Sequence, residues 1–152
     1  MKNTTSNFKV SLLVFIFLVQ SVIAQSGKGT LKIEVYGFTN SQGMARVLIF
    51  TSEQKKYFPG EFKKALVKKV VPIVDKKVTV EFADLPLGEY AVSVHHDMDN
   101  NGEINTNWLG IPNEGIGVSN DAKGSFGPPS YKDAKFQLSQ PKLSIKINMH
   151  YL

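Results

Sequence analysis

Apolar residues stand at every second position in several short segments, and this alternation is the feature that most constrains the fold. In the segment TLKIEVYG, Leu31, Ile33 and Val35 alternate with polar residues. Because successive side chains of a strand point to opposite faces, such a segment buries one face and exposes the other. The pattern predicts strands in seven segments: 30–37, 44–51, 67–74, 77–85, 86–96, 134–138 and 142–151.

Two of these segments also predict a position within a sheet. MARVLIFT is apolar at Val47 and Ile49 on one face and at Leu48 and Phe50 on the other, which is typical of a central strand. VKKVVPIV contains Pro72, which has no backbone N–H and therefore favours an edge strand or a bulge. Short strands joined by turns, without a long helix, predict an all-β fold: an antiparallel β-sandwich of about seven strands with one long structured loop.

Residues 1–24 have the layout of a secretory signal peptide. Lys2 and Lys9 precede an apolar run that ends near Ala24, where small and β-branched residues suit a signal peptidase. The run is shorter than the roughly 20 residues that a transmembrane helix needs, which disfavours an uncleaved anchor. We therefore expect cleavage after Ala24, a single β-sandwich domain over residues 25–152, and a periplasmic or extracellular location.

Composition limits how the exported domain is stabilised and what it meets. The chain has no cysteine, so stability must come from a core or a bound ion rather than from disulfides or thiolate metal sites. The net charge of +5 falls to +3 once Lys2 and Lys9 leave with the signal peptide. The densest cationic cluster, FKKALVKKV, is typical of a solvated face and too small to indicate nucleic-acid binding.

One polar segment, HHDMDNNGEINTNWLG, has the spacing of a calcium-binding loop. Its oxygen-bearing residues fall on alternate positions: Asp97, Asp99, Asn101, Glu103 and Asn105. Gly102 occupies the sixth position, where the backbone of such a loop bends sharply. This spacing lets a short backbone curl direct carboxylate, amide and carbonyl oxygens at one hard cation. The sequence therefore predicts that these five residues bind calcium.

The twelfth position of the loop departs from that pattern. A bidentate glutamate usually closes the coordination sphere there, but this chain has Trp108. The missing oxygens would come from water or from acidic residues farther along the chain: Glu114, Asp121 and Asp133. Such a site suits the weak affinity of an extracellular module, about 10⁻⁴–10⁻³ M. Replacing Asp97 or Asp99 by alanine should then lower stability in calcium but change little in a chelator.

Two other interpretations of this loop stay open. Asp97 and Asp99, or Glu114 as a second partner, could act as acid and base in the cleavage of a polysaccharide. Carboxyl groups within roughly 5 Å around a closed loop would favour an ion, whereas roughly 5–10 Å across an open cleft would favour catalysis. The third interpretation is a plain structured loop, because Asp, Asn and Gly are the ordinary turn-forming residues.

The histidines and aromatic residues near the loop are predicted to have structural roles. His95 and His96 are adjacent on a strand and face opposite ways, which disfavours a shared transition-metal site. His96 is expected to lean inward or toward the loop, as a partly buried hydrogen-bonding residue. Five residues could form a platform for a sugar or a peptide, although pinning of the long loop is favoured: Trp108, Phe126, Pro128, Pro129 and Tyr131. An exposed aromatic patch would reverse that preference.

Several motifs resemble a known bacterial family. FADLPLGEYAVSVHHD resembles the strand–turn–strand signature of transthyretin-like, or prealbumin-like, β-sandwiches. The D-x-D-x-N-G loop is followed by GIP-x-E, GVSN-x-A and GPPS, a series similar to exported bacterial proteins of the domain of unknown function 2141 family. The resemblance extends from about Leu31 to Met149. It implies a transthyretin-like or immunoglobulin-like sandwich in the envelope or outside the cell, and no established activity.

Together these features predict an exported, non-enzymatic β-sandwich module with a binding or envelope-structural role and a calcium-stabilised acidic loop. The alternative is a hydrolase or a carbohydrate-binding protein that acts on envelope or extracellular polysaccharide. The expected partner is a glycan or an envelope protein rather than nucleic acid. No transmembrane segment is expected in the mature chain.

Overall fold

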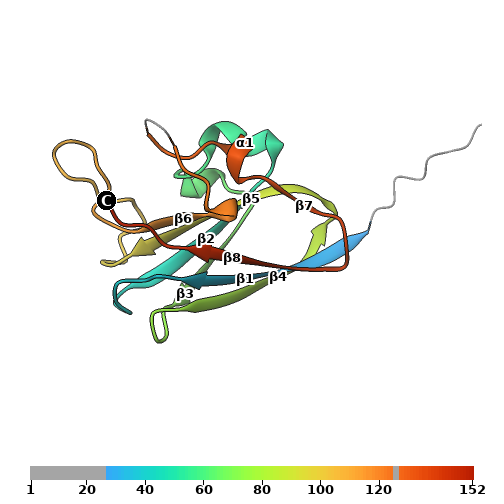
Figure 1. The fold of residues 1–152 in the computed structure, drawn as a ribbon, viewed down its shortest axis with the longest axis horizontal. Helices are drawn as coiled ribbons and strands as arrows, with labels where there is room; N and C mark the ends of the chain where they lie inside the picture. Colours follow the sequence, from blue (N-terminus) through green and yellow to red (C-terminus); the bar gives the residue numbers. More distant parts are fainter. Residues whose placement is uncertain (1–26, 125–126) are drawn as a thin grey trace, which may run out of the picture.

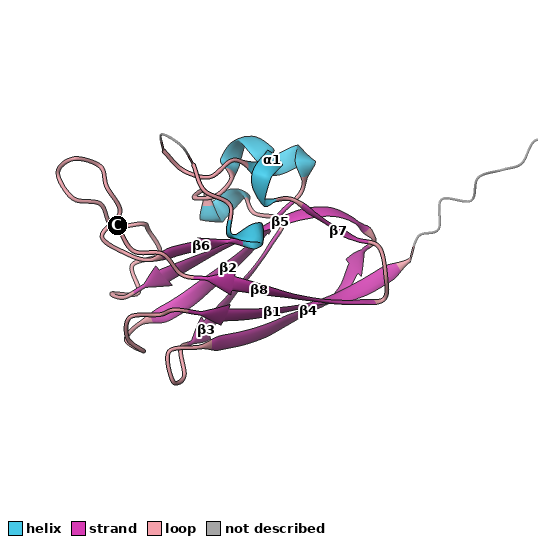
Figure 2. Ribbon diagram, in the orientation of Figure 1, coloured by secondary structure: helices cyan, strands magenta, loops and turns pink. Residues whose placement is uncertain are grey.

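The computed structural model describes residues 27–124 and 127–152, which form two packed β-sheets (Figures 1 and 2). The predicted signal peptide lies outside the described residues. The strands are β1 Lys28–Tyr36, β2 Met44–Phe50, β3 Val67–Pro72, β4 Val78–Pro86, β5 Gly88–Asp97, β6 Ile116–Val118, β7 Phe136–Leu138 and β8 Lys142–Asn148. The helical segments are short: η1 Ser52–Tyr57, η2 Phe62–Lys64, η3 Ser119–Asp121 and α1 Tyr131–Ala134. The predicted all-β sandwich is confirmed.

One sheet has three strands in the order β4-β1-β8, and the other follows the path β3-β2-β5-β6 with β7 paired to β5. The two strands with distinctive patterns lie where those patterns predict. β2 lies between β3 and β5, and its two apolar faces are buried in two different hydrophobic clusters. β3, which ends at Pro72, lies at the edge of its sheet. Both positions are therefore confirmed.

Two features of the topology differ from the predicted antiparallel, seven-stranded arrangement. β8 pairs with β1 in parallel, with Ile33 opposite Ile145. Apolar alternation has the same period in parallel and antiparallel pairs, so it does not reveal strand direction. The second difference is β6, an eighth strand of three residues inside the predicted long loop. β6 contains Gly117 and lies in a stretch rich in Gly, Pro and Asn, so the turn-forming residues around it outweigh its two apolar positions.

The five-stranded sheet buries side chains on both faces. Its inner face and the three-stranded sheet enclose the main core, which includes Leu31, Ile33, Val47 and Val92. A second cluster covers the outer face: Leu48, Phe50, Ala91, Val118, Tyr131 and Ala134. The helical segments η1 and α1 lie on this outer side, where Figure 2 shows them grouped above one sheet. The fully buried side chains of β2 are therefore divided between two cores.

The return of the chain from the long loop is held by a buried hydroxyl group. Ser119 Oγ accepts a hydrogen bond from the backbone N–H of Val92 at 2.9 Å and donates one to the carbonyl oxygen of Ala134 at 2.6 Å. Tyr131, predicted as an anchor, is buried in the outer cluster, which confirms that part of the prediction.

No helix in the described part of the chain is long and apolar enough to cross a membrane.

Candidate functional site

The acidic loop leaves the sheet at the end of β5 and returns beside the same strand. β5 ends at Asp97, and β6 runs antiparallel to it with Ile116 opposite His95. The backbone N–H of His96 donates to the carbonyl oxygen of Gly115 at 2.9 Å, which extends this pairing by one step. Glu114 is therefore held beside Asp97 although 17 positions separate them in the sequence. The base of the excursion is closed by strand pairing.

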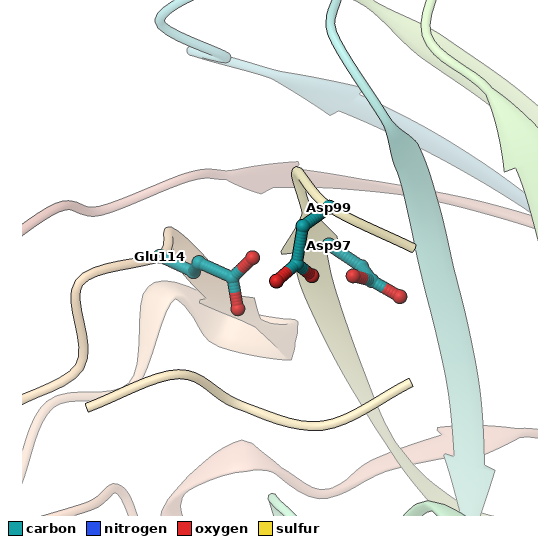
Figure 3. Close-up of side chains that lie close together, drawn as sticks. All are labelled: Asp97, Asp99 and Glu114. Carbon is teal, nitrogen blue, oxygen red and sulfur yellow. The ribbon is translucent and has the colours of Figure 1, made fainter. Parts of the chain in front are cut away.

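Three carboxyl groups meet at this base. One oxygen from each of Asp97, Asp99 and Glu114 lies within 4.8 Å of the others. Figure 3 shows the carboxyl groups of Glu114 and Asp99 pointing toward one another, with Asp97 next to Asp99. Asp97 and Glu114 are buried, whereas Asp99 is exposed. Like charges this close repel one another unless cations or N–H donors compensate them. The donors around each carboxylate therefore determine how far its negative charge is offset.

The negative charge of Asp97 is compensated by donors from the neighbouring strand β2 and from the loop itself. Its Oδ2 accepts hydrogen bonds from Arg46 Nε of β2 and from the N–H of Gly102, the latter at 3.0 Å, and its Oδ1 accepts the N–H of Asn101 at 3.2 Å. Burial by itself would raise the pKa of Asp97, but the hydrogen bonds from Arg46 and Gly102 outweigh it and hold that pKa below its ordinary value. Asp97 is thus an ionised, buried carboxylate at neutral pH.

The other predicted ligands fold around Asp99. Its Oδ2 accepts the side-chain amides of Asn105 and Asn101 at 2.9 and 3.0 Å, and its Oδ1 accepts the backbone N–H of Asn101 at 3.2 Å. Asn101 Oδ1 accepts the N–H of Glu103 at 2.7 Å, and the Glu103 side chain is exposed. The structure therefore gathers Asp97, Asp99, Asn101 and Asn105 into one turn, and it places the carboxyl group of Glu103 at the surface.

Glu114 takes the place that the twelfth loop position leaves open. Its Oε1 accepts the N–H of Met98 at 2.8 Å, and its Oε2 accepts the N–H of Asn105 at 3.1 Å, so it ties both arms of the loop together. The other two acidic candidates lie elsewhere. Asp121 accepts hydrogen bonds from Asn148, and Asp133, in the first turn of α1, accepts one from the hydroxyl group of the N-cap residue Ser130. Of the three residues considered from the sequence, only Glu114 joins the cluster.

His95 lies directly behind Glu114. Its Nε2 is 2.9 Å from Glu114 Oε2, and its ring stacks on Phe62 with a centroid distance of 5.1 Å. Burial lowers the pKa of His95 by more than the bond to Glu114 raises it, so the neutral ring donates its Nε2–H to the carboxylate. His95 Nδ1 is buried and has no hydrogen-bond partner among the described residues. The ring therefore orients Glu114.

His96 faces the opposite side of β5, as the alternation of strand side chains predicts. It is fully buried, and its two ring nitrogens lie 2.7 Å from the Tyr151 hydroxyl and 2.8 Å from the carbonyl oxygen of Gln42. The prediction of an inward, hydrogen-bonding histidine is confirmed. The two histidines do not converge on one site.

Arg46 is the functional residue that sequence patterns miss. It stands opposite His95 in the pairing of β2 with β5, which brings its guanidinium group to Asp97. One signal was present: a charged residue on a strand predicted to be buried on both faces needs a charged partner. Nothing in the sequence identifies that partner, because 51 positions separate Arg46 from Asp97.

The outermost part of the loop, residues 107–111, is here called the loop tip. Trp108, expected to pin the loop, is 90% exposed, so that prediction is wrong for this residue. Phe126 lies outside the described residues. Trp108 follows a bend made by Asn107 and faces solvent, away from the core to which Tyr131 is anchored. An aromatic residue at the loop tip is therefore available for contact with a partner.

Two clefts flank the loop. One, of about 1050 Å³, is lined by residues of the loop, of the turn after η1 and of the segment before α1: Tyr57, Phe58, Ile111, Pro112, Pro128 and Pro129. The other, of about 560 Å³, lies between the loop and the cationic face of β3, and Arg46, Lys63, Lys68 and Ile104 line it. Gly60, Glu61 and Ile104 line both clefts, which are therefore adjacent.

Comparison with known proteins places these features in a family context. The sequence model of the family described as "Uncharacterized protein conserved in bacteria (DUF2141)" matches residues 33–146, which is 114 of the 152 residues. No curated protein and no solved structure matches the chain significantly. The matched span contains the whole acidic loop together with Arg46, His95 and Glu114.

Proposed function

The chain belongs to this bacterial family, as its motifs predict, and from the geometry of the acidic loop we propose that it is an exported, non-enzymatic β-sandwich module whose loop binds calcium. The observation that carries the proposal is the convergence of Asp97, Asp99 and Glu114, each with an oxygen within 4.8 Å of the others. A single calcium ion binds oxygen ligands at about 2.3–2.6 Å, so ligands on opposite sides of it lie about 5 Å apart. The observed spacing fits one shared ion.

The hydrogen bonds of the cluster leave acceptor capacity for an ion. A carboxylate has about four lone-pair sites. Each of the three carboxylates accepts three N–H donors, from Arg46 and the loop for Asp97, from two asparagines for Asp99, and from His95 and the loop for Glu114. One site on each group remains, which supports a three-carboxylate set completed by amide oxygens or water.

The charge of the cluster also suits a divalent ion of modest affinity. Three carboxylates and the guanidinium group of Arg46 leave a net charge of −2. Arg46 competes with an ion for Asp97, and the loop is already closed by its own hydrogen bonds. Both features favour the weak affinities of extracellular calcium modules, about 10⁻⁴–10⁻³ M.

The same geometry argues against acid–base catalysis. Paired catalytic carboxylates lie on opposite sides of a bound substrate, at least about 5 Å apart. Here Asp97 and Glu114 are buried at the loop base, and backbone N–H groups occupy the faces that a substrate would need. The arrangement therefore favours a structural ion rather than a hydrolase.

Calcium is expected to stabilise the protein, and Asp99→Asn is expected to weaken that effect. With calcium at 100 times the dissociation constant, the free energy of unfolding should rise by about 2.7 kcal/mol, because the ion binds only the folded loop. Removing the exposed Asp99 charge should raise the dissociation constant about tenfold, since affinity follows the number of charged ligands. The measurements are thermal melting and calorimetric titration of residues 25–152, which contain all described elements, after treatment with a chelator.

Asp75→Asn provides the matched control, because it also removes one exposed carboxylate. Asp75 lies in the turn between β3 and β4 with a φ of 49°, a conformation that asparagine tolerates. Magnesium should give the smaller shift, because it demands near-ideal octahedral geometry. A melting temperature that millimolar calcium leaves unchanged would refute the proposal, as would equal calcium affinities for Asp99→Asn and the unmodified protein.

A carbohydrate ligand is the second candidate, favoured by the larger cleft. Its walls combine Tyr57 and Phe58 with the prolines 128 and 129, and Lys56 and His150 also line it. Aromatic walls with a few polar groups are typical of ligand sites of this size. Titration with soluble envelope polysaccharides, followed by nuclear magnetic resonance shifts of the cleft residues, tests this candidate. Shifts scattered over the whole surface would exclude the cleft as a specific site.

A further inference from the structure

The loop tip presents three apolar side chains to solvent within four consecutive positions. Trp108 is 90% exposed, Leu109 59% and Ile111 40%. Single exposed apolar residues are ordinary, but a contiguous group at the end of a projecting loop marks an interaction site. In Figure 1 this loop extends beyond the ends of the strands, on the side where the chain also ends. The group is therefore free to contact a broad surface.

The segment around the loop tip carries no charge. Residues 104–113 read INTNWLGIPN and contain no Asp, Glu, Lys, Arg or His, although the chain as a whole is one-fifth charged. Transfer of a charged side chain into a lipid environment is costly, whereas Trp, Leu and Ile favour it. Ten uncharged residues between the acidic base and Glu114 leave the loop tip compatible with an apolar medium.

Most backbone N–H groups of the loop tip are paired within the loop tip itself. Asn107 Oδ1 accepts the N–H groups of Leu109 and Ile111 at 2.9 and 3.0 Å. The carbonyl oxygen of Asn107 accepts a hydrogen bond from the N–H of Gly110 at 2.9 Å. The backbone N–H of Asn107 donates to the carbonyl oxygen of Ile111 at 2.8 Å. Backbone groups that enter lipid must be paired internally, because no water is available there. Asn107 thus forms a compact turn in which four of the five backbone N–H groups are paired, and the carbonyl oxygens of Trp108, Leu109 and Gly110 keep partners only where headgroups or water are present, as in the interfacial layer.

Two cationic residues line the cleft that part of the loop tip also lines. Lys56 and Lys123 line the larger cleft together with Gly110 and Ile111, and the Lys56 ammonium group lies over the Tyr57 ring, 4.8 Å from its centroid. Both lysines are exposed. Lysines near a membrane surface attract anionic headgroups by about 1 kcal/mol each. A tryptophan with aliphatic neighbours and flanking lysines is the combination found in side chains that lie at the boundary between headgroups and acyl chains.

From these four observations we propose that the loop tip inserts into the interfacial layer of a membrane that contains anionic lipids. Trp108, Leu109 and Ile111 enter the boundary between headgroups and acyl chains, and Lys56 and Lys123 contact the headgroups. A sugar platform would use the flat face of Trp108 but would gain little from the two aliphatic side chains. The inference goes beyond the proposed calcium site and does not rest on it, because the loop tip is shaped by Asn107 rather than by the carboxylates.

Vesicle binding by residues 25–152 tests the proposal, with Trp108 as an internal reporter, since it is the only tryptophan of the chain. Vesicles of phosphatidylglycerol and phosphatidylethanolamine should shift Trp108 emission to shorter wavelength, and brominated acyl chains should quench it. Leu109→Asn should lower the partition coefficient about tenfold, because burial of one leucine is lost while the reporter remains. Leu66→Asn is the matched control: Leu66 is 45% exposed and precedes β3, at the end of that strand away from the acidic loop.

The titrations are done in a chelator, so that their outcome is independent of the calcium site. Emission that the vesicles leave unchanged, together with no sedimentation of protein with vesicles, would overturn the proposal. Equal partitioning of Leu109→Asn and Leu66→Asn would also overturn it, because binding would then not depend on the loop tip. A response of Trp108 to soluble polysaccharide but not to vesicles would assign the loop tip to sugar binding instead. Melting temperatures of the two variants confirm that both are folded.

Discussion

Replacing Asp97 by alanine is expected to lower the free energy of unfolding by about 3 kcal/mol even in a chelator, and by more in calcium because a ligand of the ion is also lost. Asp97 is fully buried and accepts hydrogen bonds from Arg46, Asn101 and Gly102. Alanine would leave the Arg46 guanidinium without its carboxylate and two loop N–H groups without an acceptor. The spacing of the loop alone predicts little loss in a chelator, so Arg46 changes the expectation for this residue.

Urea denaturation at neutral pH, with calcium and with a chelator, measures this loss. Asp99→Ala is the matched comparison: Asp99 is exposed, and its replacement should cost little in the chelator. A double-mutant cycle with Arg46→Met isolates the ion pair, and the two losses should be less than additive. An Asp97→Ala protein as stable as the unmodified protein in the chelator would show that the Arg46 pair does not stabilise the fold.

The pH dependence of this loss follows from the pKa of Asp97. Arg46 and Gly102 hold that pKa below its ordinary value, so the folded state favours the ionised form. The stabilisation is complete above the unfolded pKa of about 3.9. It is lost as the pH falls through the lowered pKa of the folded state. The stability difference between the unmodified protein and Asp97→Ala should therefore decrease in strong acid.

Replacing Gly43 by alanine is expected to cost at least about 2–3 kcal/mol and to weaken calcium binding as well. Gly43 has a φ of +72°, and a Cβ there would lie 2.1 Å from the carbonyl oxygen of Asp97 and 2.6 Å from the Cα of Met98. Both contacts are with backbone atoms, so relieving them moves the turn at Gly43 and the end of β5 apart, at the point where Met44 pairs with Asp97. That movement displaces the Asp97 carboxylate from Asp99 and Glu114.

Gly110→Ala distinguishes the cost of the steric clash at Gly43 from the cost of a positive φ. Gly110 has a nearly equal φ of +76°, but a Cβ there meets no atom within 4 Å. Its replacement should cost about 1 kcal/mol, the usual penalty for a left-handed residue with a side chain, and should leave calcium affinity unchanged. Urea denaturation and calorimetric titration of the two variants give both quantities. Equal losses would contradict the argument, because the close approach of Gly43 to β5 would then be irrelevant.

Local patterns predicted most of the strands and part of the site. Alternation located seven of the eight strands of the described chain, since a half-buried strand leaves a signal of period two at each position. The apolar faces around Leu48 placed β2 at the centre, and Pro72 placed β3 at the edge. Alternate spacing of Asp97, Asp99, Asn101 and Asn105 predicted that their side chains would share one turn, and they do.

The remaining features depend on partners that are distant in the sequence. The parallel pairing of β8 with β1 depends on the path of the chain, and alternation carries no direction. The exposure of Trp108 could not be predicted either, because a tryptophan in a long loop serves equally well as an anchor or as a contact. The uncharged, apolar composition of the loop tip became informative only after the fold had shown that the loop projects into solvent.

The sequence by itself determined the class of fold, the order of the main strands and the identity of the polar loop, because each depends on residues that are near neighbours in the chain. The tertiary structure alone decided that Arg46 pairs with Asp97, that Glu114 closes the cluster and that His95 supports it from behind. These contacts join β2, β5 and the segment just before β6: an ion pair between Arg46 and Asp97, and a hydrogen bond from the neutral His95 ring to Glu114. Only the register of the assembled sheet determines which charges meet.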